Sequence, residues 1–223
     1  MKEFKNIKNI LFDLDGVLYD DLEAVFGQVS RKMTKYISNK LNLNLEKAKE
    51  LQTNYFHKYN TSLNGLMIHH DIDPEDFLNY VHDIDLTFMK KDLVLRNELE
   101  NLKTKKFIFT NGSKNHAKNI TEHLGIDDLF DGLFDIVDAE FSPKPTAKAF
   151  DLMIKKFKIN PKETLYIEDI AKNLSIGKER GTITAWLIND EYWGKKESDK
   201  EFIDYKIENL SLFLKEIRLL QNS

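Results

Sequence analysis

The segment ILFDLDGVLY places two aspartates, Asp13 and Asp15, directly after an apolar run that ends at Phe12. Two negative charges this close at the end of a buried strand repel each other unless a cation neutralises them. A carboxylate that touches both a metal ion and a phosphate group can attack phosphorus, and a second one can act as acid and base. An EF-hand does not fit, because the twelfth position counted from Asp13 is Ala24 instead of glutamate.

Three further polar segments follow apolar runs elsewhere in the chain. Thr110-Asn111-Gly112 comes after KFIF, Glu168-Asp169 comes after TLYI, and Lys144 lies in SPKP. The carboxyl ends of parallel strands open onto one crevice, so we expect these segments to converge there with the two aspartates. Each segment alone is also typical of an ordinary turn or helix cap, but four of them at strand ends of one sheet indicate a site.

The residue types in these segments predict two adjoining subsites. Asp13, Asp15, Glu168 and Asp169 supply only oxygen ligands, which favour Mg²⁺. The hydroxyl of Thr110, the backbone N–H groups around Gly112 and the ammonium of Lys144 make an anion pocket suited to phosphate.

The pattern of apolar residues predicts an α/β fold. Residues 7–12 read as a strand, the pattern is helical from about residue 21 to residue 102, and short strands alternate with amphipathic helices after residue 105. This alternation indicates a Rossmann-like parallel sheet, and the helical block reads as an inserted cap over one edge of it. We therefore predict a core of residues 1–19 and 93–223 and a helical cap of residues 20–92. The helices expected in the cap include 46–59, 62–70 and 74–81, the last with Asp73 as its cap and Pro74 in its first turn.

Composition excludes several classes of protein. The 223 residues are 41% hydrophobic and carry a net charge of −4, which offers no overall attraction for a nucleic acid polymer or a membrane surface. No cysteine is present, which removes disulfides and thiolate sites and fits a reducing cytoplasm. The N-terminal apolar run is too short for a signal peptide.

The segments FDLDGVLY, FTNGSKNHAKNITEHLGIDDLFDG, SPKPTAKAF and YIEDIAKNL resemble the four ordered motifs of the haloacid dehalogenase (HAD) superfamily of aspartyl-phosphate hydrolases. The resemblance implies that Asp13 is the nucleophile and that Asp15 is the acid/base and gives its backbone carbonyl to Mg²⁺. It implies that Thr110 and Asn111 hold phosphate, that Lys144 bridges phosphate and nucleophile, and that Asp169 binds Mg²⁺. Glu168 would either ligate the metal through water or orient its neighbour.

Within the superfamily, the TNGSKNHA segment, Tyr19 and the cap segment 59–85 look most like the pyrimidine 5'-nucleotidase branch. The expected activity is a Mg²⁺-dependent phosphomonoester hydrolase acting on UMP or CMP. Alternatives are a phosphatase of another small phosphorylated metabolite, such as phosphoglycolate or a sugar phosphate, and a β-phosphoglucomutase-like phosphomutase. A 2-haloacid dehalogenase needs neither Asp15 nor the acidic cluster, and a degenerate binding module would have lost Asp13 or Lys144. The oligomeric state cannot be read from the sequence.

The histidines are expected to serve structure or the surface, because no His-Glu-x-x-His pattern occurs. His116 stands one turn into the helix after the phosphate loop, and we interpret it as a helix-surface residue in preference to a substrate contact. Phe56 and its apolar neighbours are interpreted as cap core in preference to a base-stacking platform.

Overall fold

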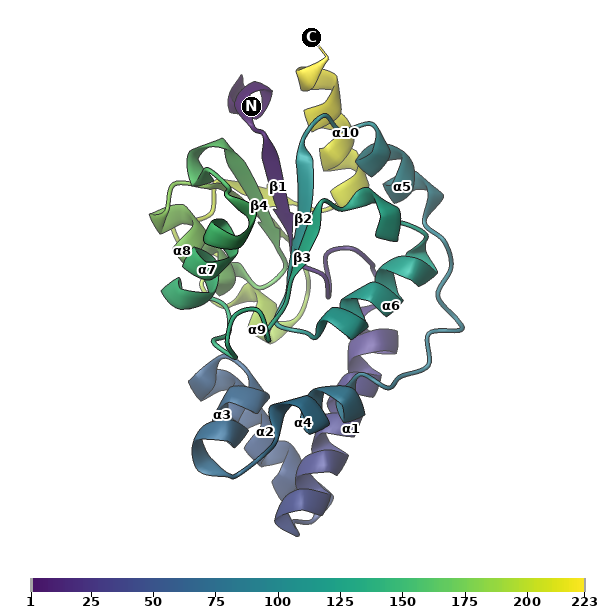
Figure 1. Ribbon diagram of the computed structural model, residues 1–223, viewed down its shortest axis with the longest axis vertical. Coiled ribbons are helices and arrows are strands. Elements are labelled where there is room, and N and C mark those ends of the chain that lie inside the picture. The colour runs from purple at the N-terminus through teal and green to yellow at the C-terminus, as the bar shows by residue number, and fades with distance from the viewer. Residues whose placement is uncertain (1, 223) are drawn as a thin grey trace.

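The computed structural model describes residues 2–222, and its strands form a six-stranded parallel sheet in the order β3–β2–β1–β4–β5–β6 (Figure 1). The strands are β1 (Asn9–Phe12), β2 (Lys105–Phe109), β3 (Gly132–Phe134), β4 (Thr164–Glu168), β5 (Ile183–Leu187) and β6 (Tyr205–Ile207). The helices are α1 (Leu22–Leu41), α2 (Leu45–Tyr59), α3 (Ser62–His69), α4 (Pro74–Val81), α5 (Leu93–Glu100), α6 (Lys114–Leu124), α7 (Ala147–Phe157), α8 (Leu174–Glu179), α9 (Tyr192–Lys195) and α10 (Leu210–Gln221).

The central strands are apolar on both faces because helices cover both sides of the sheet. In β1, Ile10 and Phe12 contact one buried cluster while Leu11 contacts the other, as the two-residue period of a strand requires. Figure 1 shows α7 and α8 on one face and α5, α6 and α10 on the other. This sandwich fixes the position of the strand ends, from which the polar segments emerge.

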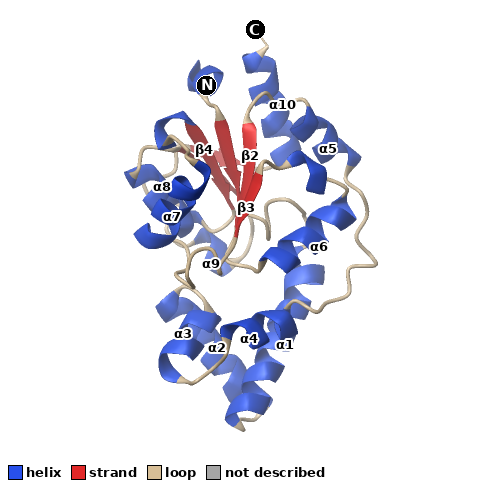
Figure 2. Ribbon diagram, in the orientation of Figure 1, coloured by secondary structure: helices blue, strands red, loops and turns tan. Residues whose placement is uncertain are grey.

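The helices α1 to α4 form a separate layer beyond the carboxyl ends of the strands (Figure 2). They enclose their own apolar cluster, to which Tyr36, Leu66 and Phe77 belong. Local caps define their ends: the Asp21 side chain accepts from Ala24 N, and Asp73 accepts from Glu75 N and Asp76 N ahead of Pro74 at the first helical turn. The predicted α/β fold with an inserted helical cap is confirmed, whereas the exact boundaries at 19/20 and 92/93 stay a prediction.

Two segments after the strands position distant residues. β3 ends at Phe134, and the Asp135 carboxylate accepts from Lys114 N and Asp138 N, which folds the chain into a turn. The polar segment after β5 contains the short helix α9, which carries Trp193 toward the cap. Among residues 2–222, no helix has the length and apolar character that crossing a bilayer requires.

Candidate active site

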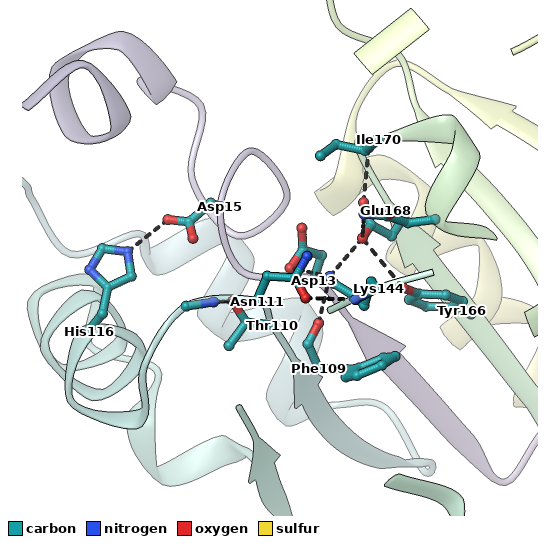
Figure 3. A network of polar contacts seen from close by, with 12 residues as sticks. Asp13, Asp15, Phe109, Thr110, Asn111, His116, Lys144, Tyr166, Glu168 and Ile170 are labelled. Carbon is teal, nitrogen blue, oxygen red and sulfur yellow. Dashed lines mark hydrogen bonds and ion pairs between the residues drawn. The ribbon is translucent and has the colours of Figure 1, made fainter. Parts of the chain in front are cut away.

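The polar segments converge at the carboxyl ends of three adjacent strands. Asp13 follows β1, Thr110 follows the neighbouring β2, and Glu168 is the last residue of β4 on the other side of β1. Figure 3 shows Asp13 between the side chains of these flanking segments, with Lys144 reaching in from the segment before α7. The sequence-based expectation that Asp13, Lys144, Glu168 and Thr110 share one crevice therefore agrees with the structure.

Lys144 is a buried ammonium that ties the site together. Its Nζ lies 2.8 Å from Asp13 Oδ1 and 2.7 Å from Glu168 Oε1, and it donates to the Phe109 carbonyl at 2.9 Å. Burial by itself lowers the pKa of a lysine, but here the charges of Asp13 and Glu168 outweigh it and the pKa of Lys144 is raised. Lys144 is therefore a fixed positive charge against the Asp13 carboxylate.

Asp13, Glu168 and Asp169 form a buried acidic cluster in which one oxygen of each lies within 4.8 Å of the others. Burial, followed by repulsion from Glu168, raises the pKa of Asp13 to about 7. The same two causes raise the pKa of Asp169 well above its ordinary value. A divalent cation would offset the repulsion within this cluster.

The donor set fits Mg²⁺. Both carboxylate oxygens of Asp169 are buried and accept no hydrogen bond from the rest of the described chain, which leaves them free to act as ligands. Gly16 faces them with no side chain, and a Cβ at that position would lie 2.4 Å from Asp169 Oδ2. Buried carboxylate oxygens without donors, next to a second carboxylate and free of nitrogen or sulfur ligands, are the chemistry of a hard divalent cation.

Glu168 differs from its neighbour because its oxygens already have partners. Oε1 accepts from Lys144 and from Tyr166 Oη at 3.4 Å, while Oε2 accepts from Ile170 N at 2.9 Å (Figure 3). Oε1 also accepts from Asn173 Nδ2 at 2.8 Å. This arrangement favours the orienting alternative for Glu168 over ligation of the metal through water.

The loop after β2 is preformed by its own hydrogen bonds. Thr110 Oγ1 accepts from Gly112 N at 2.9 Å, and Asn111 Oδ1 accepts from Lys144 N at 2.8 Å. Ser113 caps α6 by accepting from His116 N. The loop and the first turn of α6 thus lie beside the acidic cluster, where N–H groups and a helix N-terminus favour an anion.

Asp15 points away from the acidic cluster (Figure 3). Its Oδ1 accepts from Tyr19 Oη at 2.6 Å and from His116 Nε2 at 2.9 Å. Burial opposes the charged form of Asp15, but the interactions with His116 and Tyr19 prevail and lower the pKa of Asp15 to about 2. The side chain of Asp15 therefore lies outside the acidic cluster, and only its backbone carbonyl, the ligand that the family resemblance implies, is left for the metal.

His116 was wrongly assigned to the helix surface. It is 2% exposed, and its ring stacks on His82 with centroids 4.4 Å apart. The apolar periodicity of α6 would have placed it on the inner face with Ala117 and Ile120, and its position one turn after the loop was the available signal.

A cavity of about 620 Å³ lies between the cap helices and the strand ends. Its floor includes Asp13, Lys144 and Asp169, and its cap side includes Phe26 and Phe56. Phe56 therefore faces the cavity instead of lying wholly in the cap core. Trp193 lines the same cavity and contacts both phenylalanines, with centroid distances of 6.2 and 6.3 Å.

Comparisons with known proteins agree with this architecture. The chain is 34% identical over 161 residues to phosphate metabolism protein 8 of Saccharomyces cerevisiae, covering 65% of this chain and 50% of the yeast protein. It is 28% identical over 229 residues to glyceraldehyde 3-phosphate phosphatase of Methanocaldococcus jannaschii, covering 92% and 94% of the two chains. The crystal structure of a HAD phosphatase from Thermococcus onnurineus superposes with a TM-score of 0.62 at 19% identity, covering 95% and 98%, which shows a shared fold.

The family described as haloacid dehalogenase-like hydrolase matches residues 7–181, a span that includes the acidic cluster, Lys144 and the loop after β2. Together with the six-stranded sheet and its helical insertion, this match shows that the chain belongs to the haloacid dehalogenase-like hydrolases.

Proposed function

We propose that this protein is a Mg²⁺-dependent phosphomonoester hydrolase that works through an aspartyl-phosphate intermediate on Asp13. The observation that carries the proposal is the contact of Asp13 Oδ1 with Lys144 Nζ at 2.8 Å beside the unpaired oxygens of Asp169. A carboxylate held in one orientation by a buried ammonium and facing a cation site is poised to attack phosphorus. The M. jannaschii relative, which is named as a phosphatase and aligns over most of both chains, supports the same reaction class.

Each residue then has a distinct task. Asp13 forms a bond to phosphorus as the ester P–O bond breaks. Asp15, which must first take up a proton from solvent against its lowered pKa, gives that proton to the departing oxygen. Asp15 then takes a proton from the water that hydrolyses the phosphoaspartate. Thr110, Asn111 and Gly112 hold the phosphate oxygens, and Lys144 keeps Asp13 aligned.

The cation would be held by Asp13, the backbone carbonyl of Asp15 and Asp169, with Glu168 orienting the site. When bound, Mg²⁺ supplies positive charge that offsets the clustered carboxylates and the phosphate oxygens. The side chain of Glu168 keeps its role through Lys144 and Ile170 N, to which it is already bonded.

For the substrate we propose a pyrimidine nucleoside 5'-monophosphate. The cavity of about 620 Å³ falls within the range of roughly 300–1,000 Å³ typical of sites for drug-sized ligands. A three-carbon phosphate would leave most of this space to water. The rings of Phe26, Phe56 and Trp193 offer apolar surface against which a planar base can lie. The second candidate, another small phosphorylated metabolite, is favoured by the M. jannaschii relative.

A substrate panel with MgCl₂ and with EDTA tests this proposal. We expect phosphate release from UMP and CMP with Mg²⁺, none with EDTA, and a loss of several orders of magnitude in Asp13→Asn, since no other group can replace a covalent nucleophile. Asp20→Asn, which changes an exposed aspartate in the segment after Tyr19, is the matched control and should keep full activity.

Equal rates on purine, pyrimidine and sugar phosphates would overturn the nucleotide assignment. Activity that survives EDTA or Asp13→Asn would overturn the hydrolytic mechanism. A phosphorylated second sugar in place of free phosphate would indicate a mutase. A cytoplasmic setting, expected from the lack of cysteine, belongs to the same proposal.

A further inference from the structure

The two hydrogen bonds to Asp15 use the same carboxylate oxygen. Tyr19 Oη and His116 Nε2 both donate to Oδ1, at 2.6 and 2.9 Å. The other oxygen, Oδ2, faces the loop after β2, because a Cβ built on Gly112 would lie 3.8 Å from it. One oxygen is therefore anchored while the other is presented toward the loop expected to hold phosphate.

Packing on the inner face of α6 accounts for the burial of His116 but does not require an imidazole there. Its Nδ1 is buried and has no hydrogen-bond partner among residues 2–222, although a buried polar atom left unpaired destabilises a fold. If His116 only filled space, an apolar residue could take its place without leaving a buried nitrogen unpaired. The single polar contact that its side chain makes in the described chain is the bond to Asp15.

The ring of His116 is also held in place by the cap. His82, which directly follows α4, stacks on it at an interplanar angle of 15°, and His82 Nδ1 lies 2.9 Å from Ser113 Oγ. The imidazole is thus fixed from the cap on one side and by its own helix on the other.

We propose that His116 is a positioning residue for the acid/base: it fixes Asp15 Oδ1 so that Oδ2 alone is free to exchange the proton with the leaving group and with water. His82 supports the ring in this orientation. The inference rests on the proposed function, since it assigns Asp15 the acid/base role. Proton transfer depends steeply on geometry, so a carboxylate that must first find its orientation reacts more slowly than one already held there.

The test compares esters that differ in their need for an acid. An alkyl oxygen is a poor leaving group and requires the proton from Asp15, whereas p-nitrophenolate leaves readily without it. The variants are His116→Phe, which keeps a ring against His82 but removes the donor, and His116→Gln, which restores an N–H. Measured values are kcat/KM for p-nitrophenyl phosphate and for the alkyl phosphate that the wild type hydrolyses fastest.

We expect His116→Phe to lower kcat/KM for the alkyl ester by about 30-fold, below the full 10²–10⁴ that general acid catalysis supplies, and to change the aryl ester less than about threefold. His116→Gln should recover most of the loss. Tyr19→Phe, which removes the other donor to Oδ1, should show the same selectivity and provides an independent variant if His116→Phe does not fold. His123→Phe, an exposed histidine on the same helix, is the matched control and should change neither value.

Equal losses on both esters, or a His116→Gln variant no better than His116→Phe, would show that His116 acts only through packing and would overturn the inference. These outcomes leave the proposed function standing, because the wild type still hydrolyses both esters with Mg²⁺. Failure of the wild type to hydrolyse either ester would overturn the proposed function and this inference together.

Discussion

Glu168 is a fully buried carboxylate. Its contribution to stability depends on how many hydrogen bonds its two oxygens accept. Its two oxygens accept hydrogen bonds in a place that water does not reach, where an unpaired oxygen is costly. The donors are Lys144, Asn173, Tyr166 and the Ile170 N–H. The ordering of Lys144 against Asp13 therefore also depends on the groups that hold Glu168 in place.

We predict that Asn173→Ala lowers the free energy of unfolding by about 2 kcal/mol, because it leaves a buried charged acceptor with one bond fewer. The loss is not that of a helix cap, since the Asn173 side chain makes no capping bond to α8. Urea unfolding with EDTA present measures it. Asn101→Ala, at an exposed position, should stay within about 0.5 kcal/mol of wild type. Equal effects in the two variants would contradict the role given to Asn173.

Gly16 lies in the turn that follows β1, and in this turn the backbone that carries Asp13 passes close to Asp169 of the cation site. Its φ of +79° lies in the left-handed region, and the missing side chain leaves room for Asp169. The sequence motif DLDG thus encodes a backbone shape in addition to two carboxylates.

Gly16→Ala should weaken Mg²⁺ binding by more than tenfold, because the new Cβ would lie 2.4 Å from Asp169 Oδ2 and the carboxylate must move. Isothermal titration with MgCl₂ measures this. Gly181→Ala is a matched control, since Gly181 also has a positive φ, +94°, but its nearest neighbour would be 3.5 Å from the Cβ. Both variants should lose about 1–3 kcal/mol of stability from the left-handed conformation, whereas only Gly16→Ala should lose affinity for the metal. Unchanged Mg²⁺ binding in Gly16→Ala would show that Gly16 is not needed to shape the cation site.

The elements that the sequence predicted best are those with strong local signals. Asp73 and Pro74 marked the start of α4, and the apolar runs KFIF and TLYI marked β2 and β4. The contacts made by Asp135 and Trp193 were not predicted, because each residue contacts a partner that is distant in the sequence. Asp135 bonds to the start of α6, and Trp193 contacts α1 and α2.

The same limit applied to the candidate site. Strand ends in one parallel sheet converge by topology, so Asp13, Thr110, Lys144 and Glu168 could be grouped from the sequence. The apolar period of α6 indicates that His116 faces inward, but its contacts with Asp15 and His82 depend on how α6 and the segment after α4 pack together, which no local pattern encodes. The sequence thus identified the residue types of the site better than the orientation of each side chain.

At the level of the whole fold, the acidic cluster makes stability depend on pH and on the metal. The pKa of Asp13 is raised from 3.8 to about 7, so between about pH 4 and pH 7 the native state keeps a proton that the unfolded state has lost. Stability supplied by this group is complete below pH 4 and is lost as the pH rises through 7. Asp169 acts in the same direction, because its pKa is also raised.

We therefore predict that the free energy of unfolding with EDTA falls as the pH is raised from about 5 to about 7.5, and that excess MgCl₂ removes most of this fall. The cation stabilises the ionised carboxylates, so the difference between the two conditions should grow with pH. Urea unfolding at a series of pH values, with and without Mg²⁺, measures both curves.

The Asp13→Asn variant isolates the cause. An amide does not titrate in this range, so the fall between pH 5 and 7.5 with EDTA should be shallower than in wild type, and the variant should gain less from Mg²⁺. Exposed carboxylates such as Asp76 and Asp128 have lowered pKa values and change protonation at lower pH, so they do not mask the comparison. Buried His82 has a lowered pKa and contributes a rise in stability with pH in the same interval, but it is present in both proteins and cancels when their slopes are compared. An Asp13→Asn variant with an unchanged slope would show that the buried cluster does not carry the excess charge assigned to it. The cation would then be unnecessary for relieving repulsion at the strand ends.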